Sequence, residues 1–244
     1  MKFSLLASGS KGNCCVISNH DTKIVIDCGS TQKYLKESFK KIQCEITDLD
    51  ACLITHTHTD HISCLKMFNH LPIYSEDELN VPMQIKIHED ECFQIKSMKI
   101  ESIRLSHDTR CLGYIIQDQK DKLVYITDTG YLKECYYEKI KDADYYIFES
   151  NHDLKMLIQS KRPEYVKNRI RSANGHLCNE DCARHLRKCI GEHTRQIVLA
   201  HISEEANSKE KALSVTQSAL ADIQCRPEIL AAPQFEIING GQDD

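Results

Sequence analysis

The chain is organised around residues 53–61, which read LITHTHTDH and place three histidines and one aspartate directly after a short apolar run. Successive side chains of a strand point to opposite faces, so His56 and His58 point to the same side. Asp60 and His61 follow in a turn, where the chain can present both side chains toward the same space. Imidazole and carboxylate groups that converge at the end of a buried strand are typical ligands of zinc, manganese or iron. The stretch therefore predicts a metal site, in preference to a polar loop with chance histidines.

Further candidate ligands stand at the ends of other predicted strands. His107, Asp128 and His201 each follow an apolar run that reads as a strand. The chain thus repeats one pattern, in which a strand delivers a histidine or an aspartate at its end and then turns. Together with the first cluster, these residues give seven ligands, which is enough for two divalent metal ions.

Length and composition indicate an ordinary folded protein. The 244 residues are 41% apolar and 27% charged, which suits a soluble chain with a substantial core. Apolar runs stay short of membrane-spanning length and residues 1–10 lack the features of a secretory signal, so we expect a cytoplasmic protein without a membrane partner. The thirteen cysteines are odd in number and scattered, and several fall inside predicted elements (Cys52, Cys111 and Cys189). They predict reduced core residues rather than a disulfide framework.

Charge is distributed unevenly along the chain. The net charge is −5, which argues against a protein that coats nucleic acid. Residues 155–195 nevertheless carry ten Lys or Arg and four Asp or Glu, a formal charge of +6, so the remainder carries −11. A basic block on an acidic protein favours a bound anion such as a phosphate backbone. A solvated helix face explains the composition equally well.

Hydrophobic periodicity predicts alternating groups of strands and helices. In the basic block, Pro163 suits a first helical turn, and Asn179 is predicted to cap a further helix. No linker, repeat or low-complexity stretch divides the chain, so we expect one α/β domain over residues 1–244, built as a layered sandwich. The predicted strands are 3–7, 14–17, 23–27, 49–54, 71–74, two or three within 83–105, 112–117, 122–127, 143–148, 196–200 and 236–238, and the predicted helices include 31–42, 61–69, 131–141 and 209–221.

The order of these motifs resembles the metallo-β-lactamase superfamily: His-x-His-x-Asp-His, a lone histidine, Asp-Thr-Gly and a strand-terminal histidine. The chain is most similar to the YycJ/WalJ branch, also called VicX, of nuclease-like proteins. The similarity extends over nearly the whole chain. It departs from the usual residues of the branch at Cys64, Arg162, Cys178 and Ala206, none of which is a ligand. The matching stretches are 8–10 with 12–13, 106–108 with 113–114, 127–131, 149–153, 167–172, 175–177 and 200–203.

The resemblance implies a four-layer αββα sandwich with mixed sheets and a centre of two divalent ions, with zinc, manganese and iron all suitable. Asp60 would hold the second metal and also orient or deprotonate the attacking water, and Asp128 would bridge the two ions. The other implied ligands are His56, His58 and His107 for the first metal, and His61 and His201 for the second.

Other residues near these motifs are candidates for substrate contact. His176 is predicted to donate a hydrogen bond or a proton to the phosphate or the leaving group, or else to make a structural hydrogen bond at a helix start. Asn151 and His152 are expected to line the site, and Arg169 and Arg171 to contact phosphate unless they are simply solvated. Glu149 is expected to orient a ligand histidine.

A different metal site is conceivable within residues 176–189. His176, Cys178, Cys182, His185 and Cys189 fall within fourteen residues, but they do not form two close pairs separated by a loop, as a zinc knuckle requires. The last three positions lie at helical intervals, so a buried helix face is the preferred interpretation.

Three functions remain open on the sequence. The resemblance and the basic block favour a metal-dependent phosphodiesterase, specifically a DNA exonuclease acting 5′ to 3′ by family analogy, with DNA favoured over RNA as the partner. A metallohydrolase of a small thioester, lactone, lactam or cyclic phosphodiester is the second hypothesis. A catalytically silent regulatory protein is the third, and the complete ligand set argues against it. The oligomeric state is not indicated.

Overall fold

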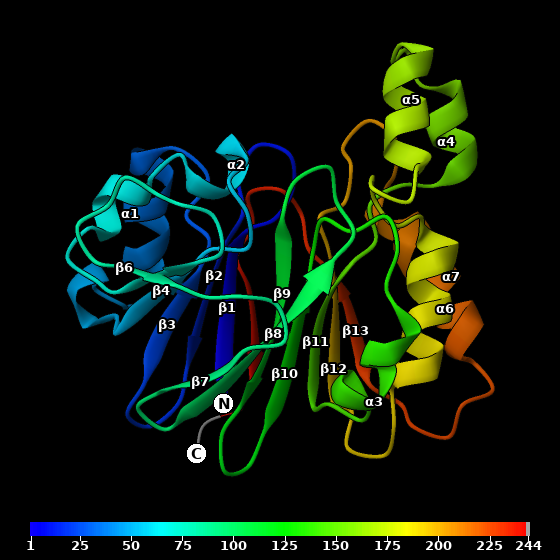
Figure 1. Ribbon diagram of the computed structural model, residues 1–244. Helices are drawn as coiled ribbons and strands as arrows, with labels where there is room; N and C mark the ends of the chain where they lie inside the picture. The colour runs from blue at the N-terminus through cyan, green and yellow to red at the C-terminus, as the bar shows by residue number, and fades with distance from the viewer. Residues whose placement is uncertain (243–244) are drawn as a thin grey trace.

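Two seven-stranded sheets form the centre of the protein, which is described here by a computed structural model that covers residues 1–242 (Figure 1). In spatial order the first sheet comprises β14 (Ile238–Gly241), β1 (Lys2–Ala7), β2 (Cys14–Ser18), β3 (Lys23–Ile26), β4 (Ala51–Leu53), β5 (Ile73–Ser75) and β6 (Gln84–Lys86). The second comprises β13 (Glu228–Ala231), β12 (Gln196–Ala200), β11 (Tyr145–Glu149), β10 (Lys122–Ile126), β9 (Cys111–Gln117), β8 (Met98–Leu105) and β7 (Cys92–Ile95).

Both sheets are mixed, as expected. In the first, β14, β1, β2 and β3 pair antiparallel, whereas β3 to β6 pair parallel. In the second, β7 to β10 pair antiparallel and β10 to β13 pair parallel. Strands β11 and β12 are buried along their whole length, which explains why they read as continuous apolar runs rather than as alternating patterns. Their carboxyl ends lie at one edge of the sheet, where the candidate ligands follow.

Three hydrophobic cores produce four layers. The inner core lies between the sheets and includes Phe3, Leu53, Tyr114 and Val198. A second core packs α3 (Tyr137–Ile140), α6 (Asn179–Cys189) and α7 (Lys209–Leu220) on the outer face of the second sheet. A third packs α1 (Gln32–Lys41) on the outer face of the first sheet, through buried side chains such as Phe39. The expected αββα sandwich is therefore confirmed.

Some helix boundaries differ from the sequence predictions. The helix predicted at 61–69 is a single turn, α2 (Thr59–Ile62), followed by a 3-10 turn at Leu65–Phe68. The helix predicted at 131–141 is reduced to a 3-10 turn at Glu134–Tyr136 and α3. In both places the preceding residues are extended, so the helix forms only after the chain has turned away from the strand end.

Helix caps in the basic block also differ. Asn179 was predicted to cap α6, but the cap is Cys178, whose sulfur accepts the backbone N–H of Asp181 at 3.4 Å. The side chain of Asn179 is fully buried instead and hydrogen-bonds Ser150 and Asn207. Pro163 precedes α5 (Glu164–Arg171) as its cap rather than lying in its first turn.

Two elements were missing from the sequence prediction, the strand β13 and the helix α4 (Leu154–Gln159). Helices α4 and α5 lie side by side and project beyond the sandwich at the end where α2 lies (Figure 1). All thirteen cysteines are free, and Cys52, Cys111 and Cys189 are fully buried, as predicted. Across residues 1–242, no helix combines the length and the apolar character that crossing a bilayer would need.

Candidate metal centre

Sharp turns at the ends of three strands place acidic and imidazole side chains at one edge of the sandwich. Asp27 follows β3, Asp128 follows β10 by two residues, and His201 follows β12. Their φ angles are 59°, 60° and 53°, in the left-handed region that few residues other than glycine adopt. Backbone held in this region is typical of functional sites, because the surrounding fold must sustain its cost. Each turn redirects the chain so that the side chain stays at the strand end.

The first group of candidate ligands consists of His56, His58 and His107. One ring nitrogen from each lies within 4.8 Å of the others. The ring centroids are 4.6 Å apart for His56 and His58, 5.1 Å for His58 and His107, and 5.2 Å for His56 and His107. Burial is the largest cause that lowers the pKa of both His56 and His107, so these rings are neutral and retain a lone pair for a metal.

The second group consists of Asp60, His61 and His201, whose candidate ligand atoms also lie within 4.8 Å of one another. The Nε2 atoms of His61 and His201 are 3.7 and 4.0 Å from the same oxygen of Asp60. Gly29 allows this turn to approach, because a Cβ atom there would stand 1.6 Å from the backbone oxygen of Asp60. No other residue type fits at that position without displacing the turn.

Asp128 lies between the two groups. Its Oδ2 is 3.3 Å from Nε2 of His61 and its Oδ1 is 3.5 Å from Nε2 of His201. Asp128 also forms a ligand group with His56 and His61, so it is within reach of residues from both sets. Although burial raises the pKa of Asp128, the neighbouring His201 and His61 hold it well below its ordinary value. This carboxylate is therefore ionised and lies within reach of candidate ligands from both groups.

Two carboxylates behind the centre fix the orientation of its histidines. Asp27 accepts from Nδ1 of His61 at 2.7 Å and is itself held by the backbone and hydroxyl of Thr55. Glu149 contacts Nδ1 of His201 at 3.1 Å, which agrees with its expected role, and Nδ1 of His176 at 2.8 Å. Because Nδ1 is engaged in each ring, Nε2 is left to face the centre, as in most histidine ligands of metals. Asp27 was not among the predicted site residues, although its place at a strand end was a usable signal.

The residues fit a metal centre on two grounds. Three buried candidate ligand atoms have no hydrogen-bond partner: Nε2 of His56, Nε2 of His201 and Oδ2 of Asp128. Buried polar atoms without partners are rare and costly, and these three face a shared space. The carboxylates also stabilise positive charge at the centre. Burial lowers the pKa of His61, but Asp27 and Asp128 raise it to about 10. A mixed set of imidazole and carboxylate ligands suits zinc, manganese or iron alike.

The centre opens into a pocket of about 180 Å³. Its walls include His58, Asp60, Asp108, Arg169 and His176. Asp108, which the sequence did not single out, lies 3.3 Å from His58, 3.4 Å from His107 and 3.1 Å from Arg169. The pocket is therefore lined by candidate metal ligands and, at its rim, by the guanidinium of Arg169, which is about two-thirds exposed and paired with Asp108.

The five other predicted site residues separate into two sets. His176 lines the pocket and Arg169 stands at its rim, whereas Arg171 is exposed on the same helix and does not line it. Asn151 and His152 are almost fully buried and lie outside the pocket wall. Asn151 donates to the backbone oxygen of His201 at 2.9 Å, so it supports a candidate ligand instead of facing a substrate.

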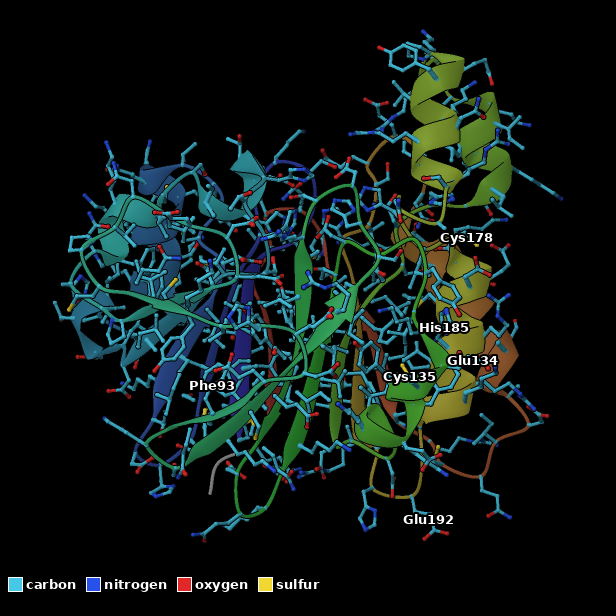
Figure 2. The ribbon with its side chains drawn as sticks, viewed as in Figure 1. Phe93, Glu134, Cys135, Cys178, His185 and Glu192 are labelled. Atoms are coloured by element: carbon cyan, nitrogen blue, oxygen red, sulfur yellow. The ribbon has the colours of Figure 1, made fainter. Side chains whose placement is uncertain are left out.

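The alternative zinc site in 176–189 is not assembled. Cys178 caps the N-terminus of α6, while His185 lies further along the helix (Figure 2). His185 contacts the hydroxyl of Tyr137 at 2.8 Å, and Cys182 and Cys189 belong to the outer core. Within the described part of the chain, the cysteines and His185 enter no group of candidate ligands. These positions form a buried helix face, as the helical spacing indicated.

Fold and site together define a class of protein: a helix-flanked double sheet with clustered histidines and aspartates at its strand ends. Solved structures share this fold. The metallo-beta-lactamase fold protein YhfI from Bacillus subtilis matches 98% of this chain and 99% of its own with a TM-score of 0.75 at 17% identity. Human tRNase Z, short form, matches 98% of both chains with a TM-score of 0.64 at 17% identity. At these identities the likeness shows the fold alone.

The family follows from the sequence comparisons. The chain belongs to the beta-lactamase superfamily, because the family model described as "Beta-lactamase superfamily domain" matches residues 22–202. It is 35% identical to exodeoxyribonuclease YycJ of Bacillus anthracis, over 89% of this chain and 88% of that protein. It is 33% identical to exodeoxyribonuclease WalJ of Streptococcus pneumoniae serotype 2 (strain D39), over 91% of this chain and 90% of that protein. The resemblance found in the sequence motifs is confirmed.

Proposed function

We propose that this protein is a metal-dependent exodeoxyribonuclease that hydrolyses phosphodiester bonds with two divalent ions. One observation carries the proposal: seven histidine and aspartate side chains that follow four strands converge beside one pocket, with Asp128 within reach of both groups. The two relatives match about nine-tenths of the chain and are named exodeoxyribonucleases, which supports DNA as the substrate. By analogy we further propose 5′ to 3′ polarity and a cytoplasmic location.

In this proposal His56, His58 and His107 would hold one ion, Asp60, His61 and His201 would hold the other, and Asp128 would be a ligand within reach of both groups. When bound, two such ions polarise a phosphate, lower the pKa of a water and stabilise a leaving oxygen. Zinc, manganese and iron are all compatible with the donor set. The seven side chains are held in position by the strand ends and by the carboxylates behind them. They therefore need little conformational rearrangement when a metal ion binds.

The chain's own residues supply proton transfer. Asp60 lies at the pocket wall with its pKa below the ordinary value: burial raises it, but the neighbouring His201 and His61 lower it further. It remains an acceptor at neutral pH and orients the attacking water. His176 faces the pocket and is held by Glu149 at 2.8 Å, which suits a donor to the departing 3′ or 5′ oxygen. Arg169 at the rim binds a phosphate of the strand.

A cleavage time course on end-labelled DNA tests the proposal directly. Single- and double-stranded oligonucleotides, labelled at either the 5′ or the 3′ end, are incubated with metal-stripped protein and with protein reloaded with Mn²⁺ or Zn²⁺. We expect the reloaded protein to release label progressively from the 5′ end. Addition of a chelator should abolish this cleavage, as in the metal-stripped protein. Matched RNA oligonucleotides establish the preference for DNA. If fully loaded protein leaves every oligonucleotide intact, the proposal is wrong, and thioester, lactone and cyclic phosphodiester substrates become the next panel.

Metal affinity is expected to rise with pH. Without metal, the raised pKa values of His61, at about 10, and of His201, well above 6.5, leave both rings protonated at neutral pH. A metal ion that takes these nitrogens must displace their protons, so affinity grows by up to roughly tenfold per pH unit for each proton displaced. Competition with a chelator of known pH dependence, at pH 6.5, 7.5 and 8.5, measures the slope. If the metal affinity is independent of pH once the chelator's own pH dependence has been subtracted, the assignment of His61 and His201 as ligands is wrong.

A further inference from the structure

Helices α4 and α5 form an arm, defined here as residues 154–171, that projects from the sandwich (Figure 1). Two residues of the arm, Arg169 and Ile170, line the pocket. A small core of Leu157, Val166, Ile170 and Ala206 holds it in place. Lys167 is buried within the arm, and its ammonium donates to the backbone oxygen of Ile158 at 2.7 Å and to Glu164 at 3.0 Å. The two helices are therefore fastened to each other and to the body, so their outer side chains have defined positions.

The arm exposes apolar side chains that packing does not explain. Of the large apolar residues that are exposed in the described chain, three lie here: Tyr165 at 76%, Ile158 at 56% and Leu154 at 40%. Tyr165 is the most exposed of them all. A tyrosine with three-quarters of its surface in water contributes little to folding, and exposed aromatic rings are common where a protein binds a partner.

Tyr165 lies in line with the pocket. It precedes Arg169 by four residues on α5, and side chains at this interval share one face of a helix. Arg169 lines the pocket, and the helix rises away from it toward its N-terminus. At 1.5 Å per residue, Tyr165 is about 6 Å further out on the same face. A strand that leaves the metal centre past Arg169 would therefore meet the ring next.

The charge of the arm identifies the occupant. Residues 154–171 contain six Lys or Arg and one Glu, a formal charge of +5 on a chain whose total is −5. Arg162 is paired with Glu205 and Lys167 is buried, but Lys155, Lys161 and Arg171 remain exposed. A polyanion that also carries flat apolar groups matches this combination. Unpaired bases stack on aromatic side chains while the backbone follows a basic surface, whereas paired bases are not available to a lone ring.

We propose that Tyr165 is a stacking platform that grips a base in the single-stranded end of DNA, one helical turn outside the metal centre. The inference rests on the proposed exodeoxyribonuclease function and adds the substrate form and the residue that recognises it. Arg169 holds the phosphate nearest the pocket, and Tyr165 holds an adjacent base. The arm thereby directs an unpaired end into the centre.

Binding measurements separate stacking from charge. The probe is a fluorescent single-stranded oligonucleotide with phosphorothioate linkages, which are hydrolysed slowly, titrated with metal-loaded protein at several salt concentrations. We expect Tyr165→Ala to weaken binding roughly tenfold, the scale of one lost base stack, without changing the salt dependence. Tyr165→Phe keeps the ring and should bind within twofold of the parent. Arg169→Ala should instead reduce the slope of log affinity against log salt by about 0.7, because one phosphate contact is lost.

A matched control uses the same arm. Ile158→Ala removes another exposed apolar side chain and should bind DNA within twofold of the parent. If Tyr165→Ala also binds within twofold, or if Tyr165→Phe loses as much affinity as Tyr165→Ala, the stacking proposal is wrong. In either case a parent protein that cleaves DNA leaves the exonuclease proposal standing. If the loaded parent binds no DNA yet hydrolyses bis(p-nitrophenyl) phosphate, the exonuclease proposal itself fails.

Discussion

Replacing Asp128 by asparagine is expected to remove metal from both positions and to slow DNA cleavage by about a thousandfold or more, because the reaction would lose the electrostatic stabilisation of a dinuclear centre. Asp128 is the residue that approaches both ligand groups, with oxygens 3.3 Å from His61 and 3.5 Å from His201. The asparagine amide keeps the shape but supplies no anionic oxygen, so it cannot neutralise two adjacent cations.

Fold is expected to survive this change. Removal of one member of a buried ion pair costs about 3–5 kcal/mol when a charge is left without a partner. Here Asp60, Asp27 and Glu149 still face the same two histidines, so positive charge remains compensated. Circular dichroism and thermal unfolding of the metal-free proteins should therefore show a folded variant. This keeps loss of metal distinct from loss of structure.

A rim ligand provides the matched comparison. His58 belongs to only one ligand group, and its side chain is 39% exposed, whereas that of Asp128 is 3% exposed. His58→Ala is expected to retain about one ion per chain by elemental analysis, against two for the parent and fewer than one for Asp128→Asn. Two tightly held ions in Asp128→Asn, or equal losses in both variants, would contradict the shared position assigned to this carboxylate.

Local sequence was sufficient to locate the ligand candidates. His56 follows β4 of the first sheet, and His107, Asp128 and His201 follow β8, β10 and β12 of the second. Strands that run in the same direction bring their carboxyl ends to one edge of their sheet, and the two edges meet where His56 approaches Asp128. The strands themselves were recognisable because β11 and β12 are buried on both sides and read as unbroken apolar runs. A pattern that repeats at several strand ends therefore predicts convergence before the topology is known.

The residues that hold these ligand candidates in position could not be predicted in the same way. Asp27 reaches His61 across 34 positions, and Asn151 reaches His201 across 50, through contacts that exist only after the sheets have assembled. Asn151 and His152 looked like site residues because they end a strand, yet the chain behind the centre covers them. Position at a strand end brings a residue to the right edge, but the next segment decides whether it faces the pocket or the interior.

The predictions of one helix cap and of one edge strand failed for a related reason. Asn179 has a side chain well suited to capping, but its amide bonds Ser150 and Asn207, and the weaker acceptor Cys178 caps α6 instead. Strand β13 carries only four residues, none of them fully buried, so it lacks the apolar signal of its neighbours. In both places tertiary contacts overrode the local preference.

Substitution of His176 by glutamine is expected to slow cleavage of DNA by about 10²–10⁴-fold, the usual contribution of a positioned proton donor. His176 faces the pocket, stacks 5.2 Å from the ring of His201, and receives a 2.8 Å contact from Glu149 at Nδ1. Although burial raises it, His176 and His201 lower the pKa of Glu149 to about 2, so this carboxylate is charged at neutral pH and accepts the Nδ1–H of His176. Donation from Nε2 then takes place from the imidazolium form, in which both ring nitrogens carry a proton.

The leaving group decides between proton donation and structural support. A sugar oxygen needs a proton as it departs, whereas p-nitrophenolate is stable without one. His176→Gln should therefore hydrolyse bis(p-nitrophenyl) phosphate at close to the parent rate while its rate on DNA collapses, and its metal content should remain two ions per chain. Glu149→Gln should lower the rates on both DNA and bis(p-nitrophenyl) phosphate, because Glu149 also orients the candidate ligand His201. Equal losses on both substrates in His176→Gln would instead make His176 a structural residue, and the departing oxygen would then need another donor.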